Sequence, residues 1–555
     1  MSIRKQITYL NGKFYGGVDL GTTQEQVDNI HEATNALVFL AVCINGHWKV
    51  PLGYFLINSF SGSERANLLK KCLEIFFETG AKCYSITFDG APCNISMCKI
   101  LGANFDYFSS EFKPWISVPE FPGSKNEKII YIFWDAVHMI KLVRNTLGEK
   151  KVIINPVGEQ IKWHHIEMLQ SIQETKGLHA ANKLKKNHIN YFENKMSVRL
   201  AVQTLSSSVS SSLLFCERLN LIPNAKPTAD FCKIFNDVFD VCNCRNKLAK
   251  GDYSFPVNEK NLQRIIDLLD QFKSYVEGLK YQKNLDTDEE LLLKSQRKTG
   301  FLGLIICLEN LINVYRAVEK DGMSFLLSYK LSQDHLEVFF SALRSRGGFN
   351  NNPNAVQFRT AYKRLLVRHE ISGSRYGNCT QLDTSCILFV GANKRKDANA
   401  ICNNDTLNNE EENNIFSNID HDYDYRMPSL EDYIIDVVKY TSGFIVRKIR
   451  NNKYLCDVCD SCLVEEQNQD TSILLELKTR GKLINVSSDV HKVKSMIEVS
   501  QDSTIFNSTP MKDHLFNQDL FDNHRSQLLR LIIDYYITLR LHHFGKMHTL
   551  SITGK

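Results

Sequence analysis

Three acidic residues stand where carboxylates could hold divalent metal ions. Asp89 follows the apolar, strand-like run 83–88, Asp135 follows a second such run, 129–134, and Glu337 lies in a predicted helix. In an open α/β sheet, ligands bind at the carboxyl ends of the strands. Converging acids there can hold two divalent ions, one activating an attacking water or 3′-hydroxyl and the other stabilising the leaving oxygen.

Each acid also has an ordinary structural interpretation. Asp89 begins an Asp-Gly pair, which is common in turns. Asp135 directly precedes a predicted helix and suits its N-cap. Glu337, with Asp334 and His335, fits an exposed charged helix face. Taken one at a time, the three acids therefore leave both the structural and the metal-binding interpretation open.

The elements that would position these acids form an α/β unit. Residues 36–43 and 47–57 read as strands, with a bulge or sheet edge at Pro51. Helical spacing of apolar residues begins at Ser63 and ends at Gly80. Strand, strand, helix, strand with Asp89, strand, and later a helix with Glu337 is the order that an RNase H-like fold requires.

We predict an α/β RNase H-like fold with a mixed five-stranded sheet, its first strand incomplete, and a large all-α insertion. Sparse glycine and helical apolar spacing indicate the insertion, and polar, Asn-rich composition indicates a disordered linker. A small, mostly helical domain ends the chain. The predicted boundaries are 1–148 and 330–380 for the RNase H-like parts, 149–329 for the insertion, 393–427 for the linker and 430–548 for the last domain.

The composition is that of a globular protein, with 43% hydrophobic and 23% charged residues. No run of 18 apolar residues indicates a membrane span, and the first 21 residues contain no secretory signal. The 16 cysteines are expected as thiols or metal ligands in the nucleus or cytosol. Lys and Arg outnumber Asp and Glu by 11 to 5 in 141–199 and by 6 to 1 in 341–370. Such clusters suit a phosphate backbone, or form a solvated basic face.

Six colinear blocks resemble the P element-type transposases, a family that includes vertebrate transposase-like proteins with a THAP zinc finger. The resemblance covers roughly residues 1–380, and the last block is the most diagnostic. The blocks are YGGVDLG (15–21), FDGAPCN (88–94), WDAVHMIKLVRN (134–145), KMSVRLAVQTLSSSV (195–209), FNDVFDVCN (235–243) and QDHLEVFFSALRSRGGFNNNPNAVQFR (333–359).

This resemblance implies a nuclear DDE transposase that cuts transposon-end DNA as a homo-oligomer, using Mg²⁺ or Mn²⁺. Asp89 would be its second catalytic aspartate and Glu337 its catalytic glutamate. The insertion would bind GTP as an assembly cofactor, without a P-loop motif in the sequence. The implied nucleotide contacts are Val198 and Phe239 around the guanine, Asp240 at its edge, Lys183, Ser206 and Asn243 near phosphates or metal, and Asp334 near the nucleotide.

The same resemblance implies that the first catalytic aspartate would stand immediately before Met1, and the THAP zinc finger further upstream. Asp19 belongs to a different motif and is not expected to replace that aspartate. With two of three carboxylates we expect impaired strand transfer. One alternative is a catalytically inactive, domesticated GTP- and DNA-binding protein, and another is an unrelated metal-dependent nuclease.

A possible zinc site lies in the last domain. Cys456, Cys459 and Cys462 have CxxCxxC spacing, which suits Zn²⁺ but supplies three ligands. Free thiols in a loop are the alternative. Distant histidines that could complete the site are His491, His542, His543 and His548. The segments 440–448 and 477–486 also resemble the family, with DNA contact or dimer support as their implied role.

Overall fold

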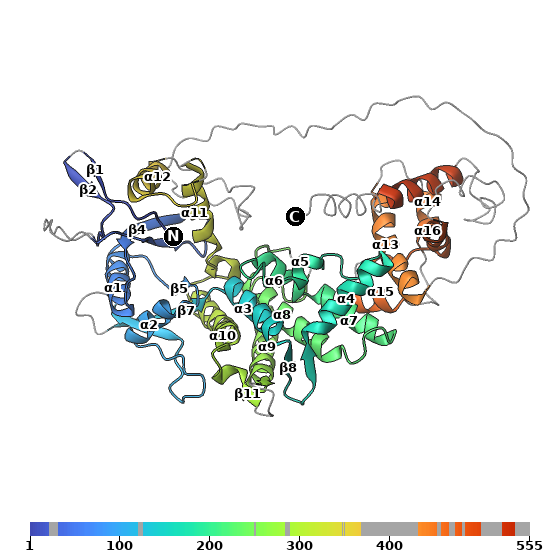
Figure 1. The fold of residues 1–555 in the computed structure, drawn as a ribbon, viewed down its shortest axis with the longest axis horizontal. Coiled ribbons are helices and arrows are strands. Elements are labelled where there is room, and N and C mark those ends of the chain that lie inside the picture. The colour runs from blue at the N-terminus through green and yellow to red at the C-terminus, as the bar shows by residue number, and fades with distance from the viewer. Residues whose placement is uncertain are drawn as a thin grey trace, which may run out of the picture. The chain divides into compact units, whose positions relative to one another are not determined.

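The computed structural model forms two compact units, which are described separately (Figure 1). The first contains Met1–Leu388 and Ile473–Lys482, and the second contains Phe389–Ser472 and Leu483–Lys555. The predicted linker at 393–427 lies outside the described residues. Within both units the structure describes residues 1–10, 12–20, 31–119, 126–248, 251–282, 289–346, 348, 350–367, 431–451, 457–464, 472–479, 483–500 and 524–538.

The strands of the RNase H-like fold form two sheets. Strand β3 (Asn35–Val42) pairs antiparallel with β4 (Lys49–Ile57). Their register shifts after Phe39, because Phe39 pairs with Gly53 while Leu40 pairs with Pro51. This confirms the irregularity predicted at Pro51, which as a proline cannot donate to a regular ladder.

The second sheet has the order β5-β7-β6. Strand β5 (Ser85–Phe88) is parallel to β7 (Glu127–Trp134), and β6 (Trp115–Pro119) is antiparallel to β7. The sheet is mixed, as predicted, but among the described residues no strand joins β3 to β5. The predicted continuous five-stranded sheet is therefore not seen in this part of the chain.

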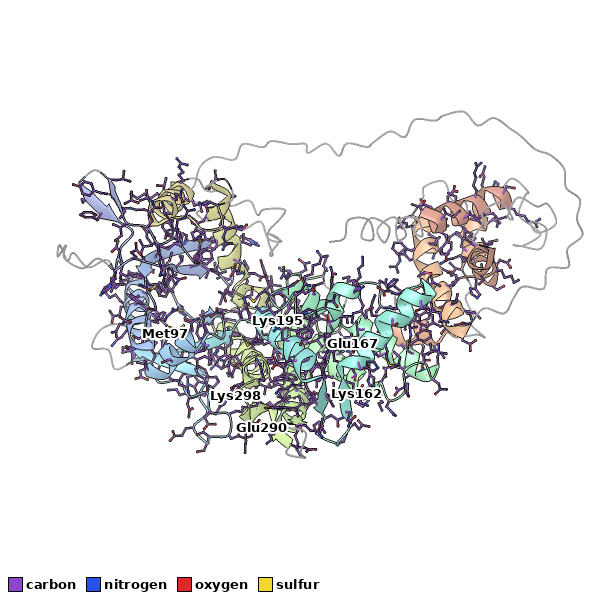
Figure 2. The ribbon with its side chains drawn as sticks, viewed as in Figure 1. Met97, Lys162, Glu167, Lys195, Glu290 and Lys298 are labelled. Carbon is purple, nitrogen blue, oxygen red and sulfur yellow. The ribbon has the colours of Figure 1, made fainter. Side chains whose placement is uncertain are left out.

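Helices α1 (Gly62–Glu78) and α2 (Pro92–Ile100) pack against each other closely. Ser61 and Glu64 form a capping box that starts α1 one residue before the predicted Ser63. A Cβ on Gly62 would lie 2.4 Å from Ser96 Oγ. Met97, labelled in Figure 2, is buried beside it.

Helices α11 (Asp334–Arg346) and α12 (Ala355–Val367) share an apolar core with the β3-β4 sheet. Tyr54 of β4 meets the rings of Phe358 and Tyr362 edge-on at 5.1 and 4.7 Å. A separate hairpin of β1 (Thr8–Leu10) and β2 (Lys13–Tyr15) precedes this core in sequence and projects beside α12 (Figure 1).

The insertion is mainly helical, but a small four-stranded sheet corrects the all-α prediction. Its three-residue strands are too short to show an alternating pattern. The sheet, ordered β11-β10-β8-β9, consists of β8 (Val152–Ile154), β9 (Gln160–Lys162), β10 (Lys280–Gln282) and β11 (Glu289–Leu291). The helices are α3 (Ala136–Lys150), α4 (Trp163–Lys176), α5 (Lys186–Ile189), α6 (Val198–Thr204), α7 (Ser207–Arg218), α8 (Lys226–Cys242), α9 (Glu259–Glu277) and α10 (Lys298–Lys320), with 3₁₀ turns at Leu292–Lys294 and Ser328–Leu331.

Helix α10 lies at the centre of the first unit. It is apolar on nearly all sides, as expected for a helix surrounded by protein. By length and composition it is the one described helix that could cross a membrane, yet 78% of its apolar window is buried inside the protein.

Helix α15 (Ile473–Lys478) follows the linker in sequence but belongs to the first unit, where it packs on α7. Ser211 Oγ donates to Leu477 O at 3.1 Å, and Lys478 Nζ donates to Ser208 Oγ at 3.1 Å. The described part of the second unit is helical, with α13 (Asp432–Arg450), α14 (Asp457–Leu463), α16 (Ser488–Ser500) and a helix at 524–538 around an apolar core.

Candidate catalytic and nucleotide-binding sites

Asp89 is held at the end of β5 by α2. Asn94 Nδ2 donates to Asp89 Oδ1 at 2.8 Å, and the backbone N–H of Ala91 donates to the same oxygen at 3.4 Å. Arg65 Nη1 of α1 in turn donates to Asn94 Oδ1 at 3.1 Å. Two helices thus orient one oxygen of a partly buried carboxylate.

Close packing around Gly90 explains the Asp-Gly pair better than a turn does. Gly90 lacks the positive φ of a glycine-dependent turn. A Cβ at Gly90 would lie 2.9 Å from Thr299 Cγ2 of α10 and 3.1 Å from Met139 Cε of α3. The glycine lets two insertion helices approach the chain directly beside Asp89.

Asp135 is 1% exposed and both of its carboxylate oxygens bind protein. Oδ1 accepts the backbone N–H of Gln333 at 3.1 Å, and Oδ2 lies 2.5 Å from His138 Nδ1. Its own backbone N–H donates to Phe88 O at 2.9 Å. Asp135 occupies the predicted N-cap position of α3, but its side chain makes no cap hydrogen bond to that helix. Its hydrogen bonds instead link the end of β5, helix α3 and the segment just before α11.

His138 and Lys141 of α3 extend this buried group. Burial lowers the pKa of His138, but the hydrogen bond and charge of Asp135 outweigh burial and raise the pKa above 6.5. Burial also lowers the pKa of Lys141, against the opposing charges of Asp135, Asp89 and Glu337. Lys141 therefore lies within electrostatic reach of all three acids.

Glu337 lies in the first turn of α11, where its N–H donates to Gln333 O at 3.2 Å. The Met1 amino group donates to Ala36 O at 2.9 Å. Burial lowers the pKa of this amino group, while Glu337 and Asp89 raise it. The two candidate carboxylates thus act on the same ammonium groups, those of Met1 and Lys141.

These residues fit part of the requirement for a two-metal site. Mg²⁺ prefers oxygen ligands and keeps several waters, so two carboxylates suit one ion. Among the described residues, however, no group of three or more acidic, histidine or cysteine side chains is arranged to hold a metal. Asp135 is not grouped with the other two acids, and its oxygens contact Gln333 and His138.

Two polar side chains contact three of the seven predicted nucleotide-binding residues and the neighbour of a fourth. Asn236 accepts the N–H of Ser207, next to Ser206, at 3.0 Å and donates to Asp240 Oδ2 at 3.1 Å. Ser206 itself caps α7 by accepting the N–H of Val209. The N-terminus of α7 and the end of α8 are thereby joined.

Arg245 makes the second connection. Its Nε donates to Asn243 Oδ1 at 3.2 Å, and its Nη2 pairs with Asp334 Oδ2 at 2.8 Å. Its guanidinium lies 4.5 Å from the centre of the Tyr329 ring. The network brings the end of α8 to the first turn of the α11 helix that bears Glu337.

The other three predicted nucleotide-binding residues, Phe239, Val198 and Lys183, are not part of the hydrogen bonds made by Asn236 and Arg245. Phe239 is 6% exposed and packs in the core, which fits a core residue better than an open stacking face. Val198 is partly exposed at the start of α6, and Lys183 is exposed. Helices α6 and α8 both pack on α3, so Val198 and Phe239 belong to neighbouring helices.

Family models match most of the folded chain. The TNP-like, RNase H N-terminal domain matches residues 1–102, and the TNP-like, RNase H C-terminal domain matches 329–363. The TNP-like, GTP-binding insertion domain matches 137–256. The DNA transposase THAP9, C-terminal domain matches 429–501 and 494–546. This chain belongs to the P element-type transposase family.

Two transposases illustrate the similarity. DNA transposase THAP9 from Homo sapiens is 29% identical over 389 residues, covering 69% of this chain and 41% of that protein. The Transposable element P transposase from Drosophila melanogaster is 25% identical over 407 residues, covering 73% and 50%. The chain thus spans about half, or less, of these relatives. Family membership removes the alternative of an unrelated nuclease.

A solved transposase structure has the same fold. The Drosophila P element transposase strand transfer complex aligns with a TM-score of 0.53 and 23% identity, over 66% of this chain and 75% of that one. The alignment supports the RNase H-like assignment made from the order of strands and acids.

The sequence missed the polar residues that connect these transposase sites. Asn236 on α8 and Arg245 just after α8 have the polar character of ordinary surface residues, and Gln333 acts through its backbone. The block FNDVFDVCN contained Asn236, but nothing in its spacing indicated a link to Ser207. In the basic cluster at 141–199, Lys141 and Arg144 are buried. Arg144 binds Asn194 O at 3.0 Å, near Lys195 (Figure 2), so this cluster is not one exposed face.

The predicted zinc site is only partly described. Cys456, His542, His543 and His548 lie outside the described residues. Cys459 is buried on α14, with its Sγ 3.8 Å from Nδ1 of His524, a histidine that the prediction did not include. Zinc binding by this transposase domain stays a prediction.

Proposed function

We propose that this chain is a P element-like transposase core with DDE-type, metal-dependent DNA cutting and strand transfer as its ancestral chemistry. Asp89 and Glu337 are its catalytic carboxylates. The observation that carries the proposal is that buried Asp135 joins the strand end that bears Asp89 to the start of the helix that bears Glu337, through hydrogen bonds of 2.9 Å to Phe88 O and 3.1 Å from Gln333 N. Transposon-end DNA in the nucleus is the substrate, bound by a homo-oligomer.

Asp89 and Glu337 would hold Mg²⁺ or Mn²⁺. An ion there supplies activation of the attacking water or 3′-hydroxyl. Asn94 and Arg65 keep Asp89 oriented, and Asp135 fixes the strand end and helix between which an ion would lie. Because the described residues offer two candidate carboxylates, and the positive charge of Lys141 is felt by both, we expect weak metal binding and impaired strand transfer.

The test is strand transfer of a pre-nicked transposon end with the purified chain and divalent metal. Mn²⁺ binding is measured in parallel on the chain and on Asp89→Asn and Glu337→Gln, with Asp106→Asn as an exposed carboxylate control. We expect weak Mn²⁺ binding that either site variant abolishes, and little strand transfer. Efficient strand transfer would contradict impairment, and Mn²⁺ binding unaffected by both variants would contradict the site.

GTP is proposed as an assembly cofactor of the insertion. A carboxylate can accept both N–H donors of the guanine edge, which adenine does not offer. Asn236 orients Asp240 for this role. We expect GTP to bind in preference to ATP, and Asp240→Ala to weaken GTP binding by about tenfold or more, the loss of a charged hydrogen bond. Equal binding of GTP and ATP would contradict the assignment.

A second candidate is a catalytically inactive protein that binds GTP and DNA. It is favoured by Asp135, whose oxygens are occupied and leave two candidate metal carboxylates in the described chain. This candidate predicts GTP and DNA binding that persist in Asp89→Asn and Glu337→Gln. Metal-dependent cleavage lost in both variants would favour the catalytic reading instead.

A further inference from the structure

We propose that the β1-β2 hairpin stacks its two exposed aromatic rings on the bases of a single-stranded segment of DNA bound at the catalytic site. The inference rests on the proposed function and assigns a contact surface to it. The hairpin face, defined here as Tyr9 and Phe14, is 62% and 52% exposed. Soluble domains usually bury aromatic rings of this size.

The two rings form one platform. Tyr9 and Phe14 are directly opposite in the antiparallel ladder, and their centroids lie 4.9 Å apart. Successive side chains of a strand point to opposite faces. The next residue, Tyr15, faces Arg359 of α12 at 5.2 Å, so the hairpin face points away from the domain core.

The hairpin base is firmly attached to the catalytic domain. The N–H of Arg4 donates to Pro353 O at 2.9 Å, and Asn354 Nδ2 donates to Gln6 Oε1 at 3.0 Å. Gly16 has φ +106°, and a Cβ there would lie 2.0 Å from Gln6 O. A rigid base holds the Tyr9 and Phe14 rings in a fixed position while leaving them exposed.

The charge around the hairpin favours nucleic acid. Residues 1–18 contain Arg4, Lys5 and Lys13 and no acidic residue. Helix α12 adds Arg359 and the exposed Lys363 and Arg364, also without an acid. A second copy of this face, related by twofold symmetry, would set cation against cation. Phosphates complement the cations, and bases stack on aromatic rings regardless of sequence.

The position also suits DNA held by the catalytic carboxylates. Tyr9 follows Met1 by eight residues, and Met1 packs on the apolar core that also holds Leu336 and Val338, the neighbours of Glu337. At about 3.3–3.6 Å per residue, the hairpin face lies within about 29 Å of that end of the chain. Because the bases of a duplex interior are already stacked, the rings require an unpaired stretch or a frayed end.

The test compares two labelled DNAs, a blunt duplex and the same duplex with a single-stranded 3′ extension. The intact chain should prefer the extended DNA. The double variant Tyr9→Ser/Phe14→Ser should lose that preference, by about fivefold or more for each ring that stacks on a base, and keep its affinity for blunt duplex. Leu10→Ser, an exposed apolar residue on the opposite hairpin face, is the matched control and should behave as the parent.

A second measurement needs no variant. With 5-iodouracil in the extension, light should cross-link the unaltered chain at Tyr9 or Phe14, located by mass spectrometry of the peptides. An unchanged preference in the double variant, or cross-links only elsewhere, overturns the hairpin proposal alone. A change in molecular mass of the double variant with unchanged DNA binding also overturns it, in favour of contact between copies. No binding of either DNA by the intact chain overturns the proposed function as well.

Discussion

The carboxylate of Asp135 accepts the backbone N–H of Gln333 at 3.1 Å, which joins two residues separated by 198 positions in sequence. Asp135 follows β7 and hydrogen bonds to the residue before Asp89, whereas Gln333 precedes the helix that bears Glu337. One buried residue, through its backbone N–H and its carboxylate, therefore joins the segments that bear the two candidate catalytic acids. We interpret Asp135 as a positioning residue.

Asp135→Asn should loosen the start of α11, which bears Glu337, while Asp89 keeps its hydrogen bonds from Asn94 and Ala91. The substitution removes the charge that binds His138 and weakens the acceptor for Gln333, a loss of about 2 kcal/mol. Hydrogen–deuterium exchange of residues 333–346 should accelerate relative to Asp106→Asn. Parent-like exchange in Asp135→Asn would show that other contacts hold the helix.

His138 predicts a pH dependence of this positioning. Its pKa is raised in the folded state by Asp135, so the folded protein binds the proton more tightly than the unfolded chain. The stabilisation is fully present below pH 6.5 and is lost as pH rises through the raised pKa. Thermal midpoints of the parent and His138→Gln should differ most at low pH and converge at high pH.

The control for that pH series is His164→Gln, which removes an exposed histidine paired with Glu167. It should change the midpoint little at any pH, because exposed ion pairs contribute little. If the difference in thermal midpoint between the parent and His138→Gln grew as pH rises, it would have the wrong sign. That result would refute a raised pKa of His138 in the folded protein.

Arg245 should couple the nucleotide site to α11. Its ion pair with Asp334 is largely buried, at 25% and 8% side-chain exposure. Arg245→Ala leaves the buried Asp334 charge without this partner, and we expect a cost of about 3 kcal/mol. Asp334→Asn in the same chain should restore part of the loss, giving a coupling of about 1–3 kcal/mol in a double-mutant cycle.

Measurements of GTP and ATP binding distinguish the coupling through Arg245 from recognition of the guanine base by Asp240. Arg245→Ala should weaken binding of GTP and ATP alike, because Arg245 contacts Asn243 and Asp334 rather than Asp240. Asp240→Ala should reduce the preference for GTP over ATP. Additive effects of Arg245→Ala and Asp334→Asn on stability would disprove the coupling.

Local signals explain what could be predicted from the sequence. The strands before Asp89 and Asp135 are apolar runs, and Ser61 with Glu64 starts α1 through neighbouring atoms. The order of elements therefore followed from short-range patterns, and the family blocks added Glu337. The hydrogen bond from Gln333 to Asp135 and the ion pair of Arg245 with Asp334 form between residues that are far apart in sequence. Such contacts produce no periodic pattern that could be recognised in the sequence. The three-residue strands of the insertion sheet could not be predicted for the same reason, because they form by pairing with strands elsewhere in the chain.

Close helix packing gives a last prediction. A Cβ at Gly300 of α10 would lie 2.9 Å from Leu142 Cβ and 3.0 Å from the backbone atoms Met139 O and Val143 N of α3. None of these atoms can move without shifting α3, which begins directly after Asp135. Gly300→Ala should therefore cost about 1–3 kcal/mol, even though alanine favours helix.

Gly303→Ala, one turn later, is the informative comparison. There a Cβ would meet mainly the Met139 side chain, with Sδ at 2.3 Å, and a methionine can rotate away. We expect a smaller loss, partly offset by about 1 kcal/mol of helix propensity. Gly53→Ala, with no atom within 4 Å of the new Cβ, should be close to neutral. Thermal midpoints should fall most for Gly300→Ala, with faster hydrogen exchange in α3, because of the three substitutions only this one presses its new Cβ against the α3 backbone. Equal losses for Gly300→Ala and Gly303→Ala would mean that α3 yields as easily as a side chain, and Asp135 would then lack a rigid support.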